Sequence, residues 1–218
     1  MRFLNSKVVC TFLIGLCFFF GGEAALAQSI EKRVIPISEE LFPLLSKEDC
    51  SDFIKNAQQG KEIKDFLGAT LKIEVMTNQY LRILSDSGIV DELILLPHRK
   101  GEVLCHIRTL EVSSPISFIS FYNDRGEQLS QEEFLPSIDG FHFLSPSVDR
   151  SSLSFKMIEQ LLPYLPMYGT FVEADMSLTL YPSYVSIATE EQKMILQQLL
   201  RSEPITLKWK KKGFVLEQ

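Results

Sequence analysis

Hydrophobic and polar residues alternate with a period of two along several segments between residues 71 and 122. This period is typical of β-strands that bury one face and expose the other. Short sequences rich in Ser, Asp, Asn and Gly separate the segments and are typical of turns. We therefore expect an antiparallel meander of consecutive strands at 71–75, 81–83, 91–97, 103–112 and 117–122.

Capping residues and apolar spacing predict a helix ahead of these strands. Ser46 is followed three residues later by Asp49, a pattern typical of a helix N-terminus, so a helix is expected within residues 41–55. Residues 61–67 are expected to add a further short helical turn before the first strand.

The last third of the chain predicts two more helices and further strands. Thr189 and Gln192 form a capping-box pattern ahead of an amphipathic helix. The other expected elements are a helix at 154–165, a hairpin of 176–181 with 184–188, and strands at 204–210 and 214–216. Because the strands come in hairpin groups, we expect an α+β fold, with an antiparallel meander sheet and helices packed on one face.

The predicted hairpin at residues 99–102 determines which side chains share a sheet face. With its turn centred on residues 100–101, Leu96 would face Cys105. Cys105 then lies on an apolar face, and His106 points to the opposite side because side chains alternate along a strand. We therefore do not interpret the adjacent Cys105 and His106 as a nucleophile and its base.

The first 27 residues have the pattern of a cleavable signal peptide. Two positive charges precede an apolar run at 8–20, and the small-residue motif Ala25-Leu26-Ala27 follows. The apolar run is shorter than the roughly 20 residues that span a bilayer, although an uncleaved membrane anchor is the alternative. Cys10 and Cys17 lack the preceding small residue that lipidation requires. We expect a periplasmic or secreted protein with no integral membrane segment after cleavage.

The remaining residues, 28–218, are predicted to form a single α+β domain. Its parts 41–130 and 151–218 both run from a helix to hairpins, so two similar helix-plus-hairpin halves are a hypothesis, although no sequence repeat supports it. Residues 28–218 carry 20 basic and 27 acidic residues. This acidic balance argues against nucleic acid as the partner and leaves an unknown protein or envelope component.

Two cysteines, Cys50 and Cys105, follow the predicted cleavage site. An oxidising compartment would allow a disulfide between them, provided that their Cα atoms lie within about 4.4 to 6.8 Å. Two buried free thiols are the alternative. The chain has no C-x-x-C motif for redox or zinc chemistry.

We find no sequence motif for catalysis, and we predict no catalytic residue, metal site or cofactor. G-x-S-x-G, H-E-x-x-H, P-loop and G-x-G-x-x-G motifs are all missing from the sequence. The three histidines, His98, His106 and His142, share no local metal-binding spacing. The basic run 208–212 could bind a polyanion, but lysines that alternate with Leu207 and Trp209 are more typical of sheet-edge protection.

The irregular connection at 131–146 contains three aromatic residues. It could pack onto the core, which is usual for aromatics in a loop, or it could act as a binding loop. On the second interpretation the candidate binding residues are Phe134, Asp139, Phe141, His142 and Phe143.

Several segments resemble the family called domain of unknown function 3256, exported proteins of Bacteroidales-type bacteria. The resembling segments are 41–45, 77–81, 103–109, 120–122 and 209–215, together with the leader. Residues 110–115 depart from the family's small-residue stretch with Gly-Pro. The resemblance implies export and brings no catalytic residues.

Three functions are compatible with these observations. The leading hypothesis is a non-enzymatic protein that binds through its sheet face or the connection 131–146. The second is a hydrolase of an envelope or host-derived polymer, which would need two acidic residues brought together by the fold. The third is a structural envelope component.

Overall fold

The computed structural model describes residues 29–217 except residue 112, so the predicted signal peptide and its cleavage site lie outside the described residues. The α-helices are α2 (Ile30–Val34), α3 (Ser38–Leu41), α4 (Lys47–Lys55), α5 (Leu153–Ile158) and α6 (Glu190–Leu199). The 3-10 helices are η1 (Ile35–Ile37), η2 (Ala57–Gln59), η3 (Gln131–Glu133), η4 (Gly140–Phe143), η5 (Leu162–Tyr164) and η6 (Glu173–Asp175).

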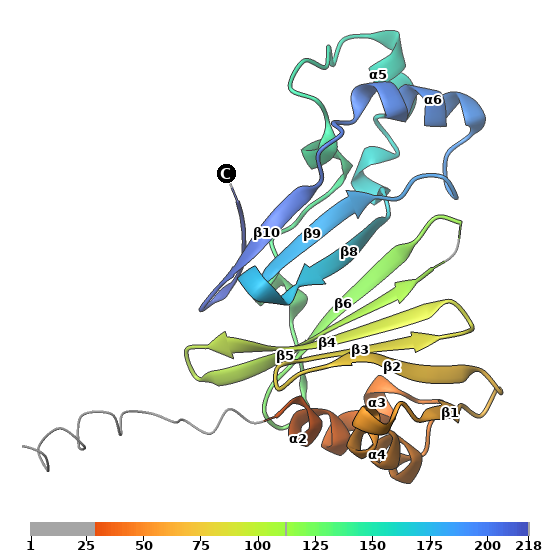
Figure 1. Cartoon of the computed structure of the whole chain (residues 1–218). Helices are drawn as coiled ribbons and strands as arrows, with labels where there is room; N and C mark the ends of the chain where they lie inside the picture. The colour runs from red at the N-terminus through yellow and green to blue at the C-terminus, as the bar shows by residue number, and fades with distance from the viewer. Residues whose placement is uncertain (1–28, 112, 218) are drawn as a thin grey trace, which may run out of the picture.

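The strands form two antiparallel sheets, which lie one above the other in Figure 1. The larger, seven-stranded sheet is a meander in sequence order: β1 (Glu62–Lys64), β2 (Thr70–Met76), β3 (Tyr80–Ser85), β4 (Ile89–His98), β5 (Gly101–Leu110), β6 (Ile116–Tyr122) and β7 (Gln128–Leu129). The four-stranded sheet has the order β11 (Gly213–Leu216), β10 (Ile205–Lys210), β9 (Ser177–Pro182) and β8 (Met167–Val172). The α+β class and the antiparallel meander are confirmed.

The register predicted for the β4–β5 hairpin was wrong by two residues. His98 pairs with Gly101 and Ile94 pairs with Cys105, because the turn consists of residues 99–100. A shift of two residues leaves every side chain on its predicted face. Cys105 is therefore buried in the apolar layer that faces the second sheet, and His106 lies on the opposite face.

The helices α2, α3 and α4 cover one face of the large sheet, below it in Figure 1. Ser46 accepts a hydrogen bond from the Asp49 backbone N–H and begins α4, as predicted. The helical turn predicted at 61–67 was wrong. Residues 62–64 instead form the edge strand β1 on β2, because sheet pairing satisfies their backbone groups.

The second sheet covers the other face of the large sheet, and its arrangement was not predicted. The hairpin partner of β9 is β8, not the segment 184–188, so the expected hairpin over Pro182 was wrong. Pro182 ends β9, and residues 184–188 form a turn that leads into the Thr189 cap of α6. Gly169 interrupts the apolar pattern of β8 because Leu178 and Leu180 fill the space where a side chain would stand.

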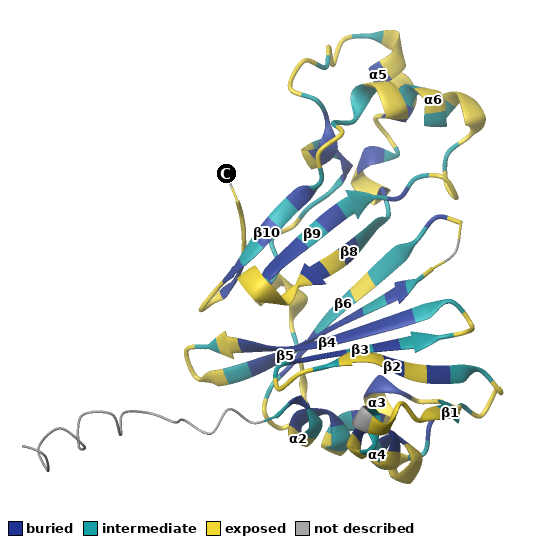
Figure 2. Ribbon diagram, viewed as in Figure 1, coloured by how far each residue is buried: buried dark blue, intermediate teal, exposed yellow. Residues whose placement is uncertain are grey.

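The helices α5 and α6 pack on each other beyond the end of the second sheet. Thr189 and Gln192 form the predicted capping box at the start of α6. The helix predicted at 154–165 is shorter than expected, since α5 ends at Ile158 and only the 3-10 turn η5 follows. Figure 2 shows that many strand residues of the two sheets are buried, while much of α5 and α6 is exposed.

The two cysteines among the described residues, Cys50 and Cys105, are free and lie on opposite faces of the large sheet. Cys50 belongs to the cluster between the helices and the large sheet, and Cys105 belongs to the cluster between the two sheets. The sheet between them prevents a disulfide.

We expect neither thiol to react with a maleimide in the native protein at pH 8, because both are buried and burial raises the pKa of Cys50 to about 11. For a chain of residues 28–218, which contains Cys50 and Cys105 alone, mass spectrometry should find two labels after unfolding in urea without reductant. Labelling only after reduction would contradict the structure.

Candidate functional site

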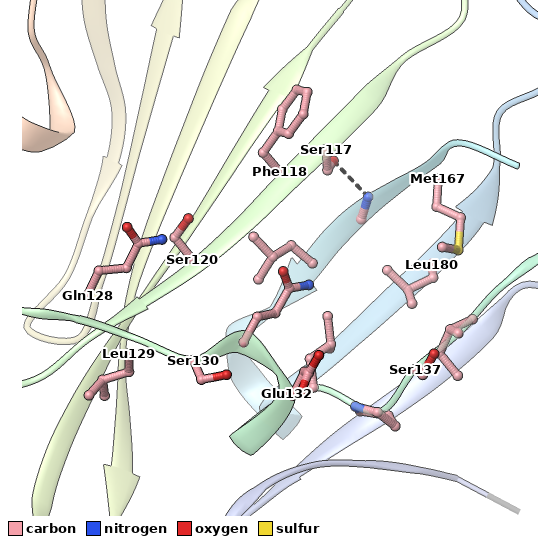
Figure 3. Close-up of a pocket in the computed structure, with 16 residues that line it drawn as sticks. Ser117, Phe118, Ser120, Gln128, Leu129, Ser130, Glu132, Ser137, Met167 and Leu180 are labelled. Atoms are coloured by element: carbon pink, nitrogen blue, oxygen red, sulfur yellow. Dashed lines mark hydrogen bonds between the residues drawn. The ribbon is translucent and has the colours of Figure 1, made fainter. Parts of the chain in front are cut away.

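A groove of about 930 Å³ opens where the two sheets diverge. Its walls are β6 of the large sheet and β8 and β9 of the second sheet, and the connection after β7 lies across it (Figure 3). The lining residues are Ser117, Phe118, Ile119, Ser120, Gln128, Leu129, Ser130, Gln131, Glu132, Leu135, Pro136, Ser137, Ile138, Met167, Gly169 and Leu180.

A chain of hydrogen bonds holds the two sheets together at one side of this groove. The Ser117 hydroxyl accepts a hydrogen bond from the Gly169 N–H at 2.9 Å, drawn as a dashed line in Figure 3. The same hydroxyl lies 2.7 Å from the Thr109 hydroxyl on β5. The position of β8 against β6 is thereby determined.

At the other side, the groove exists because β7 is very short. Opposite the β5 side, β6 pairs among the described strands with two residues of β7 alone: Leu129 faces Phe121 and Gln128 faces Tyr122. The chain then turns into η3 instead of continuing along β6. The part of β6 that precedes Phe121 therefore has no neighbouring strand from β7 on this side, and it lines the groove instead.

The polar part of the lining is almost entirely uncharged. Hydroxyl and amide groups come from Ser117, Ser120, Ser130, Ser137, Gln128 and Gln131. Among the described lining residues, Glu132 alone carries an ionisable side chain. Apolar side chains, including the largely exposed Phe118, make up the rest. A surface of this kind can hold an uncharged chain by hydrogen bonds and apolar contact.

The predicted aromatic residues of the connection do not line this groove. Phe134 and Phe143 are buried in the core between the sheets, and Phe141 packs against the cluster formed by α5 and α6. Phe134 stacks on Trp209, with ring centroids 6.3 Å apart. The expectation that these aromatics pack onto the core is confirmed for Phe134 and Phe143.

The other two candidate residues form a local cap. The Asp139 carboxylate accepts a hydrogen bond from the Phe141 N–H at the start of η4, and it lies 2.8 Å from the His142 ring nitrogen Nδ1. His142 in turn accepts a hydrogen bond from the Asp139 N–H. These interactions explain both side chains without a ligand.

Residues 131–132 and 135–138, in the same connection, do line the groove, and so do strand residues that the sequence did not single out. Ser117 and Ser120 were assigned to a strand, but no local pattern shows that one edge of this strand lacks a neighbour. The hydroxyl-rich character of β6 was the only available signal.

Two adjacent carboxylates are buried on opposite faces of β4. Asp91 faces the helices, where its Oδ1 lies 2.7 Å from His106 Nε2 and accepts a hydrogen bond of 2.7 Å from Arg108 Nε. Arg108 also donates to the Leu41 carbonyl oxygen. Burial alone would raise the pKa of Asp91, but the hydrogen bonds and charges of His106 and Arg108 outweigh it and lower the pKa below its ordinary value.

Glu92 faces the second sheet. It accepts a hydrogen bond of 2.6 Å from the Tyr80 hydroxyl and one from the Phe171 N–H on β8. Burial raises the pKa of Glu92, and these hydrogen bonds and the charge of Arg82 offset only part of that rise. The sheet separates Glu92 from Asp91, so the two carboxylates do not converge on one cleft.

Three further findings concern charge, metal sites and membranes. Lys208 was expected at a sheet edge, but β10 lies between β9 and β11, and Lys208 instead pairs with Glu217 at 3.2 Å. Within residues 29–217, apart from 112, no cluster of three His, Cys, Asp or Glu side chains could hold a metal ion. None of the helices in that part of the chain has the length and apolar character to cross a membrane.

The fold and the groove define the class of this protein: an α+β domain of two packed antiparallel sheets with an open cleft at their junction. The model of the family described as "Protein of unknown function (DUF3256)" matches residues 23–214, so the chain belongs to this family. The resemblance noted from the sequence is thereby confirmed.

A solved structure of a domain of an uncharacterized protein from Porphyromonas gingivalis W83 is similar, with a TM-score of 0.75 and 22% identity. The match covers 86% of this chain and 98% of that domain, and it shows the fold. The mouse (Mus musculus) protein DnaJ homolog subfamily C member 28 is 24% identical over 165 residues. This alignment covers 68% of our chain and 41% of the mouse protein, so the chain matches less than half of that relative.

Proposed function

We propose that this protein is an exported, non-enzymatic binding protein whose ligand lies in the groove between β6 and β8. The observation that carries the proposal is the lining of the groove, where neutral hydroxyl and amide groups surround apolar side chains. A lining of neutral hydrogen-bonding groups, with Glu132 as the one acid among its described residues, suits recognition better than acid–base chemistry.

The buried carboxylates support the same proposal. A hydrolase of the kind considered from the sequence would need two carboxylates about 5 to 9.5 Å apart in one cleft. Asp91 and Glu92 have shifted pKa values, but they lie on opposite faces of the sheet and each is occupied by structural partners. Glu132 enters the groove without a second acid among the described lining residues.

Export to the periplasm or the cell exterior is the second part of the proposal, and the leader pattern of residues 1–27 supports it. When the full chain is produced in a two-membrane bacterium, the periplasmic fraction should contain a protein beginning at Gln28. Leu13→Arg, which places a charge in the apolar run, should keep the chain uncleaved in the cytoplasm. A wild-type chain that is not cleaved, or that stays in the cytoplasm, would exclude this part.

The groove itself is tested with one blocking variant and one matched control. Ser137→Arg places a long charged side chain in the groove, whereas Ser147→Arg makes the same change at an exposed position outside its lining. The labelled mature chain is applied to an array of uncharged and singly charged octapeptides and to a glycan array. We expect binding that is lost in Ser137→Arg and retained in Ser147→Arg. Binding that survives in Ser137→Arg, or no binding to either array, would contradict the proposal.

A further inference from the structure

The strand β6 presents an edge without a partner strand to this groove. Asn123 donates a backbone hydrogen bond to Glu127 on the β7 side. Backbone groups alternate in direction along an antiparallel strand, so Phe121, Ile119 and Ser117 direct their N–H and C=O groups to that same side. The residue Phe121 is opposite Leu129 of β7. Because β7 ends at Leu129, it pairs with no residue of β6 that precedes Phe121.

The groups of Ile119 and Ser117 therefore face the groove. Neither residue has a backbone hydrogen bond on that side among the described residues. The Ser117 and Thr109 hydroxyls lie 2.7 Å apart. Such closeness is expected where two opposite residues do not exchange backbone hydrogen bonds with each other, which agrees with Ser117 directing its backbone groups away from β5. Unpaired strand edges are normally protected by charges, prolines or bulges, and β6 has none of these residues between Ile116 and Ser120.

The facing strand β8 is already occupied. The Gly169 N–H donates to Ser117, and the Phe171 N–H donates to Glu92. Side chains of the large sheet thus satisfy two outward donors of β8, those of Gly169 and Phe171. On β6, by contrast, two successive outward positions, Ile119 and Ser117, have no backbone partner on the groove side among the described residues.

We infer that the groove binds an extended peptide, which continues the line of β7 and pairs with β6 through Ile119 and Ser117. This inference rests on the proposed function and names its ligand class. The unpaired segment from Ile116 to Ser120 is about 16 Å long at roughly 3.3 Å per residue, so about five peptide residues fit beside it. Strand addition of this kind draws its affinity from main-chain hydrogen bonds.

The charge of the groove narrows the sequence of that peptide. Glu132 is the one ionisable side chain among the described lining residues, and the whole chain has a formal net charge of −6. A peptide with small or apolar side chains and a single lysine or arginine is complementary to this lining. Glu132 and the negative net charge of the chain repel acidic peptides.

Backbone pairing is tested with two isomeric peptides. The parent is an octapeptide of alternating threonine and valine with one lysine, and alternate amides are N-methylated on either the odd or the even positions. Only one of the two sets faces β6, so one isomer should lose about tenfold or more in affinity and the other should bind nearly as well as the parent. Equal affinity of both isomers, or equal loss in both, would overturn the inference.

Hydrogen exchange supplies a direct readout on the protein. On addition of the parent peptide, the amides of Ile119 and Ser117 should exchange more slowly, while those of Phe118 and Ser120, which face β5, should not change. Unchanged exchange at Ile119 and Ser117 in the presence of bound peptide would contradict pairing with β6.

Glu132→Lys should reverse the charge preference, so that a peptide with glutamate in place of lysine binds better than the parent.

The outcomes separate this inference from the proposed function. A glycan that binds wild type and fails to bind Ser137→Arg would leave the binding function standing and overturn the peptide assignment. A peptide that binds equally to Ser137→Arg would overturn both. Failure of both arrays with the folded mature chain would also overturn both.

Discussion

Replacing Asp91 with asparagine is expected to lower the free energy of unfolding by about 3 kcal/mol at pH 7. The substitution removes the negative charge that pairs with Arg108 and His106 while keeping the size of the side chain. The two partners then face a neutral amide in a buried site. Urea denaturation followed by circular dichroism measures the change. A loss below about 1 kcal/mol would mean that the network contributes little.

The pH dependence of this effect has a defined sign. The pKa of Asp91 is lower in the folded protein than in the unfolded chain, so its stabilisation is fully present above the unfolded pKa of about 4. It is lost as the pH falls through the folded pKa. The difference between wild type and Asp91→Asn should therefore shrink in denaturation experiments below pH 4.

Glu92→Gln provides the matched control on the other face of the same strand. The pKa of Glu92 is raised in the folded protein, so its ionisation opposes folding as the pH rises from about 4 through the folded pKa. Relative to wild type, Glu92→Gln should gain stability over that rise, the opposite trend to Asp91→Asn. Parallel pH profiles for the two variants would contradict the assignment of these neighbours to opposite environments.

Replacing Phe143 with alanine is expected to lower the free energy of unfolding by about 3 to 5 kcal/mol. Its side chain is 0% exposed in the core between the sheets, although it belongs to a connection rather than to a strand. Phe118→Ala is the control, because Phe118 is 58% exposed and lines the groove. Its effect on stability should stay within about 0.5 kcal/mol.

The two phenylalanine variants also separate packing from binding. Peptide or glycan affinity should fall in Phe118→Ala, whose melting temperature should stay near that of wild type. A small stability loss in Phe143→Ala would show that the connection 131–146 does not pack as the structure places it. A large loss in Phe118→Ala would show that this residue supports the fold instead of the groove.

Local patterns were sufficient to predict the five strands β2 to β6 of the large sheet and the starts of α4 and α6. Side chains alternate along a strand, so the two-residue period identified the face on which Cys105 and Ile107 are buried even though the hairpin register was wrong by two residues. The caps at Ser46 and Thr189 involve residues three positions apart and were visible for the same reason. A capping pattern needs only neighbouring residues.

The connection 131–146 shows where local reasoning loses precision. Its aromatic content indicated either packing or binding, and the sequence held no means of choosing for each residue. Phe134 became a core residue because Trp209 and Phe121, far away in the sequence, provide its contacts. Ser137 and Ile138, with no distinctive pattern, became part of the groove.

The sequence by itself determined the antiparallel meander, the buried face of each of its central strands and the residues that begin α4 and α6. Only the tertiary structure decided that a second sheet covers the large one, that β8 docks through Ser117 and Glu92, and that β7 stops short beside an open edge of β6. The physical reason is range. Alternation and capping depend on residues a few positions apart. The groove depends on where the two sheets diverge, and contacts between residues about 50 to 80 positions apart in the sequence determine that place.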